Sequence, residues 1–294
     1  MATTATFYAK PPAQHADGVP KLVERKQIPP WFRLSVPIAL LASIGSVVSL
    51  VFEDAIYGRE TANWAAQSVG QDIANLIAFP VLLAAAFFAA RGSLRAYVVW
   101  IGLLVYSAYT YAIYTFALHF GPLFLVWVAV FGLSFYALIG ALVTIDAANV
   151  KRVLAGSPGE RFASRLLMGI GSVFAVLWLS EIVPATLTGD TPEALKDVGL
   201  LTNPVHVLDL ALLLPALMIA GRLLAKRRPM GYVLAPALLI ATFFLGLGIL
   251  SLMIVSGVRG LESAPVVGVA VAMLALVEAL TAFRLLRHLP GSEV

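Results

Sequence analysis

The sequence contains no cysteine. Disulfide bonds, thiolate nucleophiles, cysteine-ligated zinc and iron–sulfur clusters are therefore excluded. Several enzyme motifs are also missing, namely the GxxxxGKS/T phosphate loop, the HExxH zinc helix, the GxSxG nucleophile elbow and the DxxxD magnesium pair of prenyl-transferring membrane enzymes. These absences argue against the best-known chemistries of phosphate-loop proteins, zinc proteases and serine hydrolases.

Charged residues are scarce as well. They make up 12% of the 294 residues, whereas hydrophobic residues make up 60% and the mean hydropathy is +0.91. This is more apolar surface than one soluble core can bury, so the composition predicts an integral membrane protein. The net charge of +4 does not indicate nucleic-acid binding, because the basic residues lie between apolar runs, where they set membrane topology.

Eight apolar segments are long enough to cross a bilayer, which takes about 20 residues of helix. Lipid offers the backbone no hydrogen-bond partners and the segments lack the alternation of barrel strands, so an all-α fold is predicted. Residues 1–30, in which prolines stand among polar groups, are predicted to form a disordered cytoplasmic tail. The predicted spans are Trp31–Phe52, Gln71–Ala90, Ala96–Ala117, Pro122–Ile145, Leu166–Thr186, Pro204–Ala225, Met230–Val255 and Pro265–Leu286.

Lysine and arginine are divided unequally between the two sides of this predicted bundle. Seventeen of the 20 fall on the side that holds both termini, and only Arg59, Lys196 and Arg259 fall on the other. Cytoplasmic segments of membrane proteins carry the excess of positive charge. Both termini are therefore predicted to be cytoplasmic, in a multi-pass protein of the cell (inner or plasma) membrane.

Two stretches of the chain, Gln71–Tyr97 and Asn203–Tyr232, resemble each other at a spacing of about 135 residues. The matched positions pair Pro80 with Pro215, Arg91 with Lys226 and Tyr97 with Tyr232. An even number of spans in each unit makes both halves point the same way. The prediction is two parallel four-helix repeats at residues 31–148 and 166–288, with a cytoplasmic linker at 149–165 and a short tail at 289–294.

Asp209 is the strongest candidate for a functional residue. Ionisable groups inside the hydrocarbon cost free energy, so they usually face a cavity or a partner. Asp209 lies one helical turn from His206, and the pair is suited to a proton relay or to two ligands of a metal ion. The alternative is a hydrogen-bonded pair that orders the bundle. Pro215 and Pro80 are predicted to kink their helices at matching places around a central site.

Three other acids in the predicted spans have simpler alternatives. Glu181 either belongs to the same site or lies among lipid headgroups, where its helix surfaces early. Glu278 either lines a vestibule or bonds to a hydroxyl on a neighbouring helix. Asp72 is predicted to cap the first turn of its span, as Asn203 is predicted to cap the span that begins at Pro204.

The third predicted span is rich in hydroxyl groups. Tyr106 and Tyr111 lie on two adjacent faces of this helix, each with other hydroxyl side chains one turn away. Such a band suits a polar pathway or a ring-bearing ligand. For Tyr111 and Tyr114, anchoring at the membrane interface is the alternative, because tyrosine collects there.

No cofactor is strongly implied. His119 and His206 are the two histidines near the membrane, and they raise haem ligation weakly, since a membrane cytochrome needs axial imidazoles from two helices. The same residues, with Asp209, are weak candidates for metal ligands. The identity of a metal, if any, is left open.

The function that fits these patterns is a transporter or permease-like protein for a small solute or ion, with its site between the two halves. One alternative is a membrane enzyme or cofactor-binding protein that acts on a lipid, quinone or haem. A second is a non-catalytic membrane subunit or scaffold. An enzyme is the less favoured reading; the expected partners are the bilayer and a small substrate, without nucleic acid, and the oligomeric state is left open.

Overall fold

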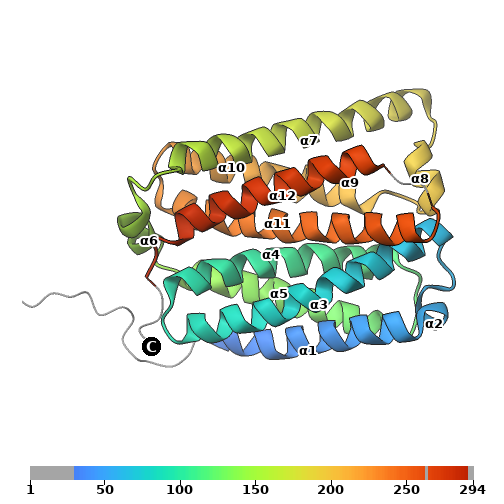
Figure 1. Cartoon of the computed structure of the whole chain (residues 1–294), viewed down its shortest axis with the longest axis horizontal. Coiled ribbons are helices and arrows are strands. Elements are labelled where there is room, and N and C mark those ends of the chain that lie inside the picture. The colour runs from blue at the N-terminus through green and yellow to red at the C-terminus, as the bar shows by residue number, and fades with distance from the viewer. Residues whose placement is uncertain (1–29, 262–263, 291–294) are drawn as a thin grey trace, which may run out of the picture.

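The computed structural model describes residues 30–261 and 264–290. The predicted tail at residues 1–30 thus lies outside the described residues apart from Pro30, and only two residues of the predicted 289–294 tail are described. In this part of the chain every element is helical, and eight helices are long and apolar enough to span a membrane. The chain is therefore a polytopic membrane protein, as the composition predicted (Figure 1).

Seven of the spans are single helices, and one is divided. The sixth span consists of α9 (Pro204–Leu208), the π-helical segment η1 (Asp209–Leu213) and α10 (Leu214–Ala225). The short helices outside the spans are α2 (Glu53–Tyr57), α6 (Ala147–Leu154) and α8 (Glu193–Val198). The single-helix spans are α1 (Pro30–Val51), α3 (Ala62–Ala90), α4 (Leu94–Ala117), α5 (Phe124–Thr144), α7 (Glu160–Thr188), α11 (Pro229–Val258) and α12 (Pro265–Leu286).

The second span begins earlier than the sequence predicted. Helix α3 starts at Ala62 rather than at Gln71, and the Thr61 side chain caps it by accepting a hydrogen bond from the Trp64 backbone N–H. The first turns of α3 contain polar residues, so their hydropathy is too low to be recognised as part of a membrane span. Their polar residues face the protein interior, where Ser68 is buried and its hydroxyl bonds to the Trp64 carbonyl.

The spans form two groups that meet along α11. In the first group, α1 packs on α3 and α5, and α4 packs on the same two helices. In the second, α10 packs between α7 and α11, and α12 packs on α11. Helix α11 also lies against α3 and α4, so it joins the groups, and Figure 1 shows it beside α4 in the middle of the molecule. The first and last spans of the first group, α1 and α5, pack on each other, whereas α7 and α12 of the second group make few contacts with each other.

Glycines allow this central approach of α11. A Cβ atom at Gly70 of α3 would overlap the backbone of Leu252, and a Cβ at Gly102 of α4 would overlap Ala237 and Ile240. Membrane helices gain little from apolar burial against each other, so close contact between small residues is an important source of their association. The two glycines therefore help to fix the interface between the groups.

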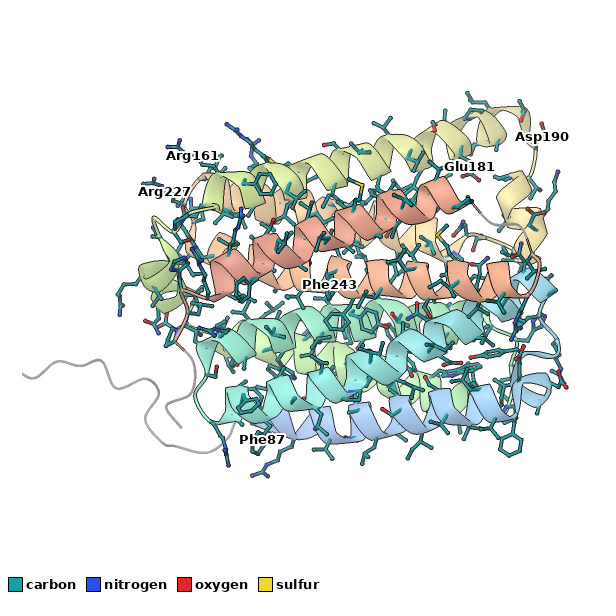
Figure 2. All side chains as sticks on the ribbon, viewed as in Figure 1. Phe87, Arg161, Glu181, Asp190, Arg227 and Phe243 are labelled. Atoms are coloured by element: carbon teal, nitrogen blue, oxygen red, sulfur yellow. The ribbon has the colours of Figure 1, made fainter. Side chains whose placement is uncertain are left out.

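The two ends of the bundle differ in charge. Arg161 and Arg227 lie at one end and Asp190 at the other, as Figure 2 shows. We call these the basic end and the acidic end. At the basic end, the Arg95 guanidinium at the start of α4 donates hydrogen bonds to the carbonyls of Leu286 and Leu289, at 3.0 and 2.9 Å, and so fastens the end of α12 to the first group.

An ion pair crosses the acidic end. Arg259, just after α11, donates two hydrogen bonds to the Glu53 carboxylate, at 2.6 and 2.8 Å. These bonds raise the pKa of the Arg259 guanidinium above its ordinary value, because they favour its charged form. Both side chains are about one-third exposed, so water and salt screen the attraction. The pair therefore positions the end of α11 against α2 more than it stabilises the fold.

Candidate functional site

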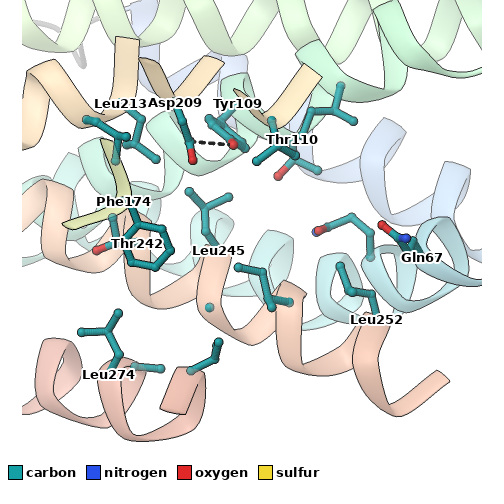
Figure 3. Close-up of a pocket in the computed structure, with 18 of the residues that line it drawn as sticks. Gln67, Tyr109, Thr110, Phe174, Asp209, Leu213, Thr242, Leu245, Leu252 and Leu274 are labelled. Atoms are coloured by element: carbon teal, nitrogen blue, oxygen red, sulfur yellow. Dashed lines mark hydrogen bonds between the residues drawn. The ribbon is translucent and has the colours of Figure 1, made fainter. Parts of the chain in front are cut away.

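A cavity of about 210 Å³ lies between helices of both groups. Its walls come from α3 and α4 on one side and from α7, the sixth span, α11 and α12 on the other. Most of the lining is apolar, as Figure 3 shows with Leu213, Leu245, Leu252 and Leu274 around the open space. A few polar side chains enter this apolar surface, and they give the cavity its chemical character.

Asp209 is hydrogen-bonded at both of its carboxylate oxygens. Its side chain is 6% exposed and lines the cavity. Tyr109 of α4 donates its hydroxyl to Asp209 Oδ1 over 2.8 Å (Figure 3), and Trp178 of α7 donates its indole N–H to Oδ2, also over 2.8 Å. Each carboxylate oxygen is thus held by a donor from a different helix, which fixes the group against the cavity wall.

The backbone at Asp209 is unusual. Asp209 begins the π-helical segment, and the Leu214 N–H bonds to the Asp209 carbonyl five residues earlier instead of to a carbonyl four residues earlier. Pro215 follows directly and has no N–H to offer, which removes one α-helical bond from the same turn. π-Helical turns are rare and occur frequently at functional sites. Pro80, the predicted counterpart of Pro215, lies inside α3, which continues through it as one α-helix.

His206 and Glu181 lie beside this site, toward the acidic end. The His206 ring packs against Trp178 with 4.5 Å between centroids, and its Nε2 lies 3.8 Å from the Glu181 Oε2. Asp209 receives its hydrogen bonds from Tyr109 and Trp178, so the structure does not give it the hydrogen-bonded pairing with His206 that the sequence suggested as an alternative. Trp178 contacts both residues instead.

The predicted cap of this span is confirmed: Asn203 accepts hydrogen bonds from the N–H groups of Val205 and His206.

Glu278 supplies a second acid to the cavity. It comes from α12, is 2% exposed and lines the cavity, with Thr242 of α11 as its polar neighbour. Thr110 of α4 also lines the cavity; its hydroxyl is buried and has no hydrogen-bond partner within the described residues. An unsatisfied buried hydroxyl costs about 1–3 kcal/mol.

The prediction that Asp72 caps a helix is wrong. Asp72 lies well inside α3, is 2% exposed and accepts hydrogen bonds from Tyr57 at 2.6 Å and Tyr114 at 3.0 Å. The error follows from the misplaced start of α3. Through these bonds Asp72 joins the short helix α2 and the helix α4 to α3. We call this buried hydrogen-bonded contact of three helices a junction.

Three of the tyrosines of α4 are buried between helices. Tyr106, Tyr111 and Tyr114 are at most 3% exposed, which contradicts the alternative that Tyr111 and Tyr114 anchor the protein at the membrane interface. The Tyr106 hydroxyl bonds to Asn75 and Gln71 at 2.8 Å each, and Tyr111 packs on Tyr114. Tyr114 lines the cavity as well as bonding to Asp72, but Tyr106 and Tyr111 stand behind the cavity wall.

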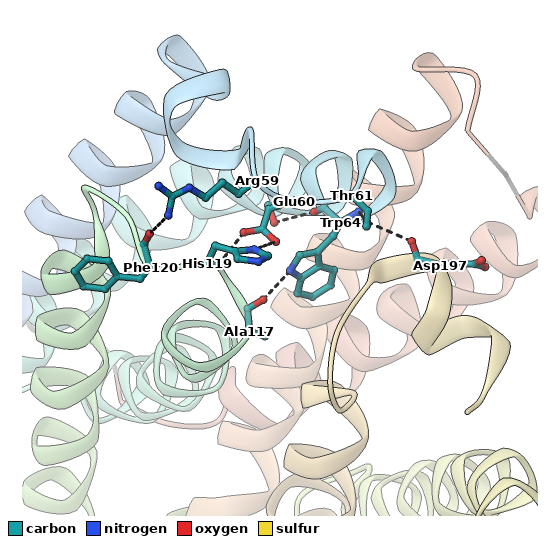
Figure 4. Close-up of polar contacts among 9 residues, drawn as sticks. Arg59, Glu60, Thr61, Trp64, Ala117, His119, Phe120 and Asp197 are labelled. Carbon is teal, nitrogen blue, oxygen red and sulfur yellow. Dashed lines mark hydrogen bonds and ion pairs between the residues drawn. The ribbon is translucent and has the colours of Figure 1, made fainter. Parts of the chain in front are cut away.

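His119 is placed apart from the cavity. Its ring Nδ1 lies 3.0 Å from the Glu60 carboxylate, and its backbone N–H donates to the same group over 2.8 Å, at the acidic end shown in Figure 4. Neither His119 nor His206 is among the described residues that line the cavity. Within the described ranges no group of three or more His, Asp or Glu side chains is arranged to hold a metal ion. The predicted metal ligands His119, His206 and Asp209 are therefore not gathered into one such group.

Sequence reasoning missed two residues of this site, Tyr109 and Trp178. Tyr109 belongs to the hydroxyl-rich helix α4, but it lies outside the two helix faces, those of Tyr106 and Tyr111, that the sequence singled out. Trp178 precedes Glu181 by one turn on α7, and that spacing is the available signal for it. Comparisons of the chain with protein-family models, with curated proteins and with solved structures found no match.

Proposed function

We propose that the protein is a transporter that moves a small solute or ion across the membrane through the cavity between its two groups of helices. The observation that carries this proposal is the place of Asp209: a buried carboxylate at a π-helical break in a membrane span, facing a cavity. Transporters commonly build their central sites from interrupted helices near the middle of the bilayer. Carboxylates inside a membrane are costly, and substrate or ion pathways are where they usually occur.

The packing of the helices adds support. The cavity is lined by α3 and α4 of the first group and by every span of the second. It therefore lies where a site between the two predicted repeats is expected. The asymmetry is also informative, since α1 packs on α5 whereas α7 barely meets α12. One predicted repeat is closed and the other loosely packed, so movement in the second would change access to the cavity.

Reconstitution tests this function. Purified full-length protein is placed in lipid vesicles, and the uptake of labelled rubidium ion, tetramethylammonium, glycine and glucose is compared with uptake by empty vesicles. We expect at least one of these to enter faster with the protein and to be slowed about tenfold or more by Asp209→Asn, because that change removes the charge at the site. Rates equal to those of empty vesicles for all four solutes would contradict the proposal.

A second candidate is a protein that binds a lipid or quinone as enzyme or carrier. The apolar lining with aromatic side chains from α4 and α7 favours it, since a ring-bearing molecule packs well there. Extraction of the purified protein with organic solvent, followed by mass spectrometry, distinguishes this candidate. A quinone or lipid recovered in stoichiometric amount from the native protein, and lost from a variant with Leu245→Trp filling the cavity, supports it over the transporter.

A further inference from the structure

The cavity contains two acidic side chains and no basic partner for them. Asp209 and Glu278 both line it, and among the described residues of its lining there is no lysine or arginine. Buried charges in proteins are normally paired, because an isolated ion loses its hydration without compensation. The cavity therefore favours an occupant that brings positive charge.

The surroundings of Asp209 suit an organic cation better than a metal ion. The hard cations that carboxylates hold, such as calcium, take six or more oxygen ligands, and the described residues contain no cluster of three acids or histidines. Aromatic side chains lie beside Asp209 instead: Tyr109 and Trp178 both bond to the carboxylate, and Phe174 packs on Trp178 with 6.0 Å between ring centroids. Aromatic faces attract ammonium groups by cation–π interaction, most strongly where water is excluded.

Thr110 is a further polar residue of the lining, although its hydroxyl oxygen is itself buried. Figure 3 shows Thr110 on the same side of the open space as Tyr109 and Asp209.

The loosest wall of the cavity adjoins lipid. Helices α7 and α12 both line the cavity but make few contacts with each other. Toward the acidic end, residues 172–188 of α7 and 265–274 of α12 include no buried residue, although both segments are largely apolar. A molecule with an apolar body partitions into the bilayer that covers these segments and meets the cavity there.

We propose that the cavity binds an organic ammonium ion with an apolar, ring-bearing body. The ammonium group contacts Asp209 and the aromatic rings beside it, Glu278 of α12 supplies a second carboxyl group, and the body packs on the leucines of the lining. This assignment rests on the proposed function, in that it names the class of solute that the transporter would carry.

Isothermal titration calorimetry of the full-length protein in a non-ionic detergent tests the assignment. The probes are phenyltrimethylammonium and benzenesulfonate, which are similar in size and opposite in charge. We expect the cation to bind and the anion not to. Asp209→Asn should weaken binding of the cation about tenfold or more, since a contact with a charged group is lost. Asp190→Asn is the matched control, because Asp190 is an exposed acid away from the cavity.

Thermal melting of each variant shows whether it is folded. If Asp209→Asn does not fold, Glu278→Gln carries the same test, with a smaller expected loss of affinity. Equal binding of the two probes, or binding of the cation that is unchanged in a folded Asp209→Asn or Glu278→Gln protein, would overturn the assignment. Vesicle uptake separates it from the proposed function: rubidium or glucose transport without cation binding refutes only the assignment, and cation binding without any uptake refutes only transport.

Discussion

Trp178 donates its indole N–H to Asp209 over 2.8 Å, and this bond joins α7 to the π-helical segment of the sixth span. The same indole packs on His206, and Glu181 lies 3.8 Å from that histidine. Residues 172–188 of α7 include no buried residue, so these polar contacts are important in holding this half of the helix to the site. The geometry of the carboxylate and the position of α7 are therefore coupled.

The Tyr109 hydroxyl is expected to stabilise the protein through Asp209. Tyr109→Phe keeps the ring and removes the donor, so the buried carboxylate retains only the indole N–H. We expect a loss of about 1.5–3 kcal/mol, the usual worth of a hydrogen bond to a charged group. The measurement is thermal melting in detergent, with Tyr136→Phe as the control, because Tyr136 is 64% exposed. Equal melting temperatures for the two variants would show that the Tyr109 bond is unimportant.

Asp72 is expected to behave as a buried junction. Asp72→Asn weakens the bonds that Tyr57 and Tyr114 donate, and we expect it to cost about 1–3 kcal/mol of stability. Asp146→Asn is the control: Asp146 caps α6 at an exposed position, and asparagine caps as well as aspartate. Melting curves decide between the two. An Asp72→Asn protein as stable as Asp146→Asn would show that the bonds from Tyr57 and Tyr114 contribute little to stability.

Gly70 is expected to be intolerant of a methyl group. Gly70→Ala places a Cβ into the backbone of Leu252 and pushes α3 away from α11. Overpacking of this kind costs about 1–3 kcal/mol. At Gly132 of α5, where a Cβ meets nothing within 4 Å, the same change should be neutral or slightly stabilising, since alanine is the better helix former. The yield of folded protein and its melting temperature test the contrast, which fails if both variants behave alike.

The basic end is expected to face the cytoplasm. Because the chain has no cysteine, single cysteines report their own accessibility without background. Ala155→Cys stands at an exposed position after α6 at the basic end, and Thr191→Cys stands at an exposed position after α7 at the acidic end. A membrane-impermeant maleimide should label Thr191→Cys in intact cells and Ala155→Cys only after lysis. The reverse pattern would invert the predicted topology.

The membrane helices were predictable because hydropathy and length decide them. All eight predicted spans correspond to helices long and apolar enough to cross a membrane in the described residues, and Asn203 caps the sixth span as its sequence indicated. The start of α3 was not predictable in the same way, because its polar first turns face the interior and resemble a loop. The wrong interpretation of Asp72 followed from that single boundary.

The candidate site was predictable only in part. Asp209 stood out because a carboxylate in an apolar run is costly wherever it lies. Its partners could not be identified, since Tyr109 and Trp178 lie on other helices and reach it only through the packing of α4 and α7. Tyr106 and Tyr111 lie on the hydroxyl-rich helix, but Tyr106 bonds to Asn75 and Tyr111 packs on Tyr114. The neighbouring helices set the rotation of α4, and the sequence does not show that rotation.

The π-helical turn at Asp209–Leu213 holds one more residue than the α-turn it replaces. Each residue of an α-helix turns the chain by about 100°, so everything before the segment is rotated by that angle relative to an unbroken helix. The direction in which His206 points is thus decided by one surplus residue. We expect deletion of Ala211 to restore the ordinary register and to turn His206 by about 100° relative to α10, away from Trp178.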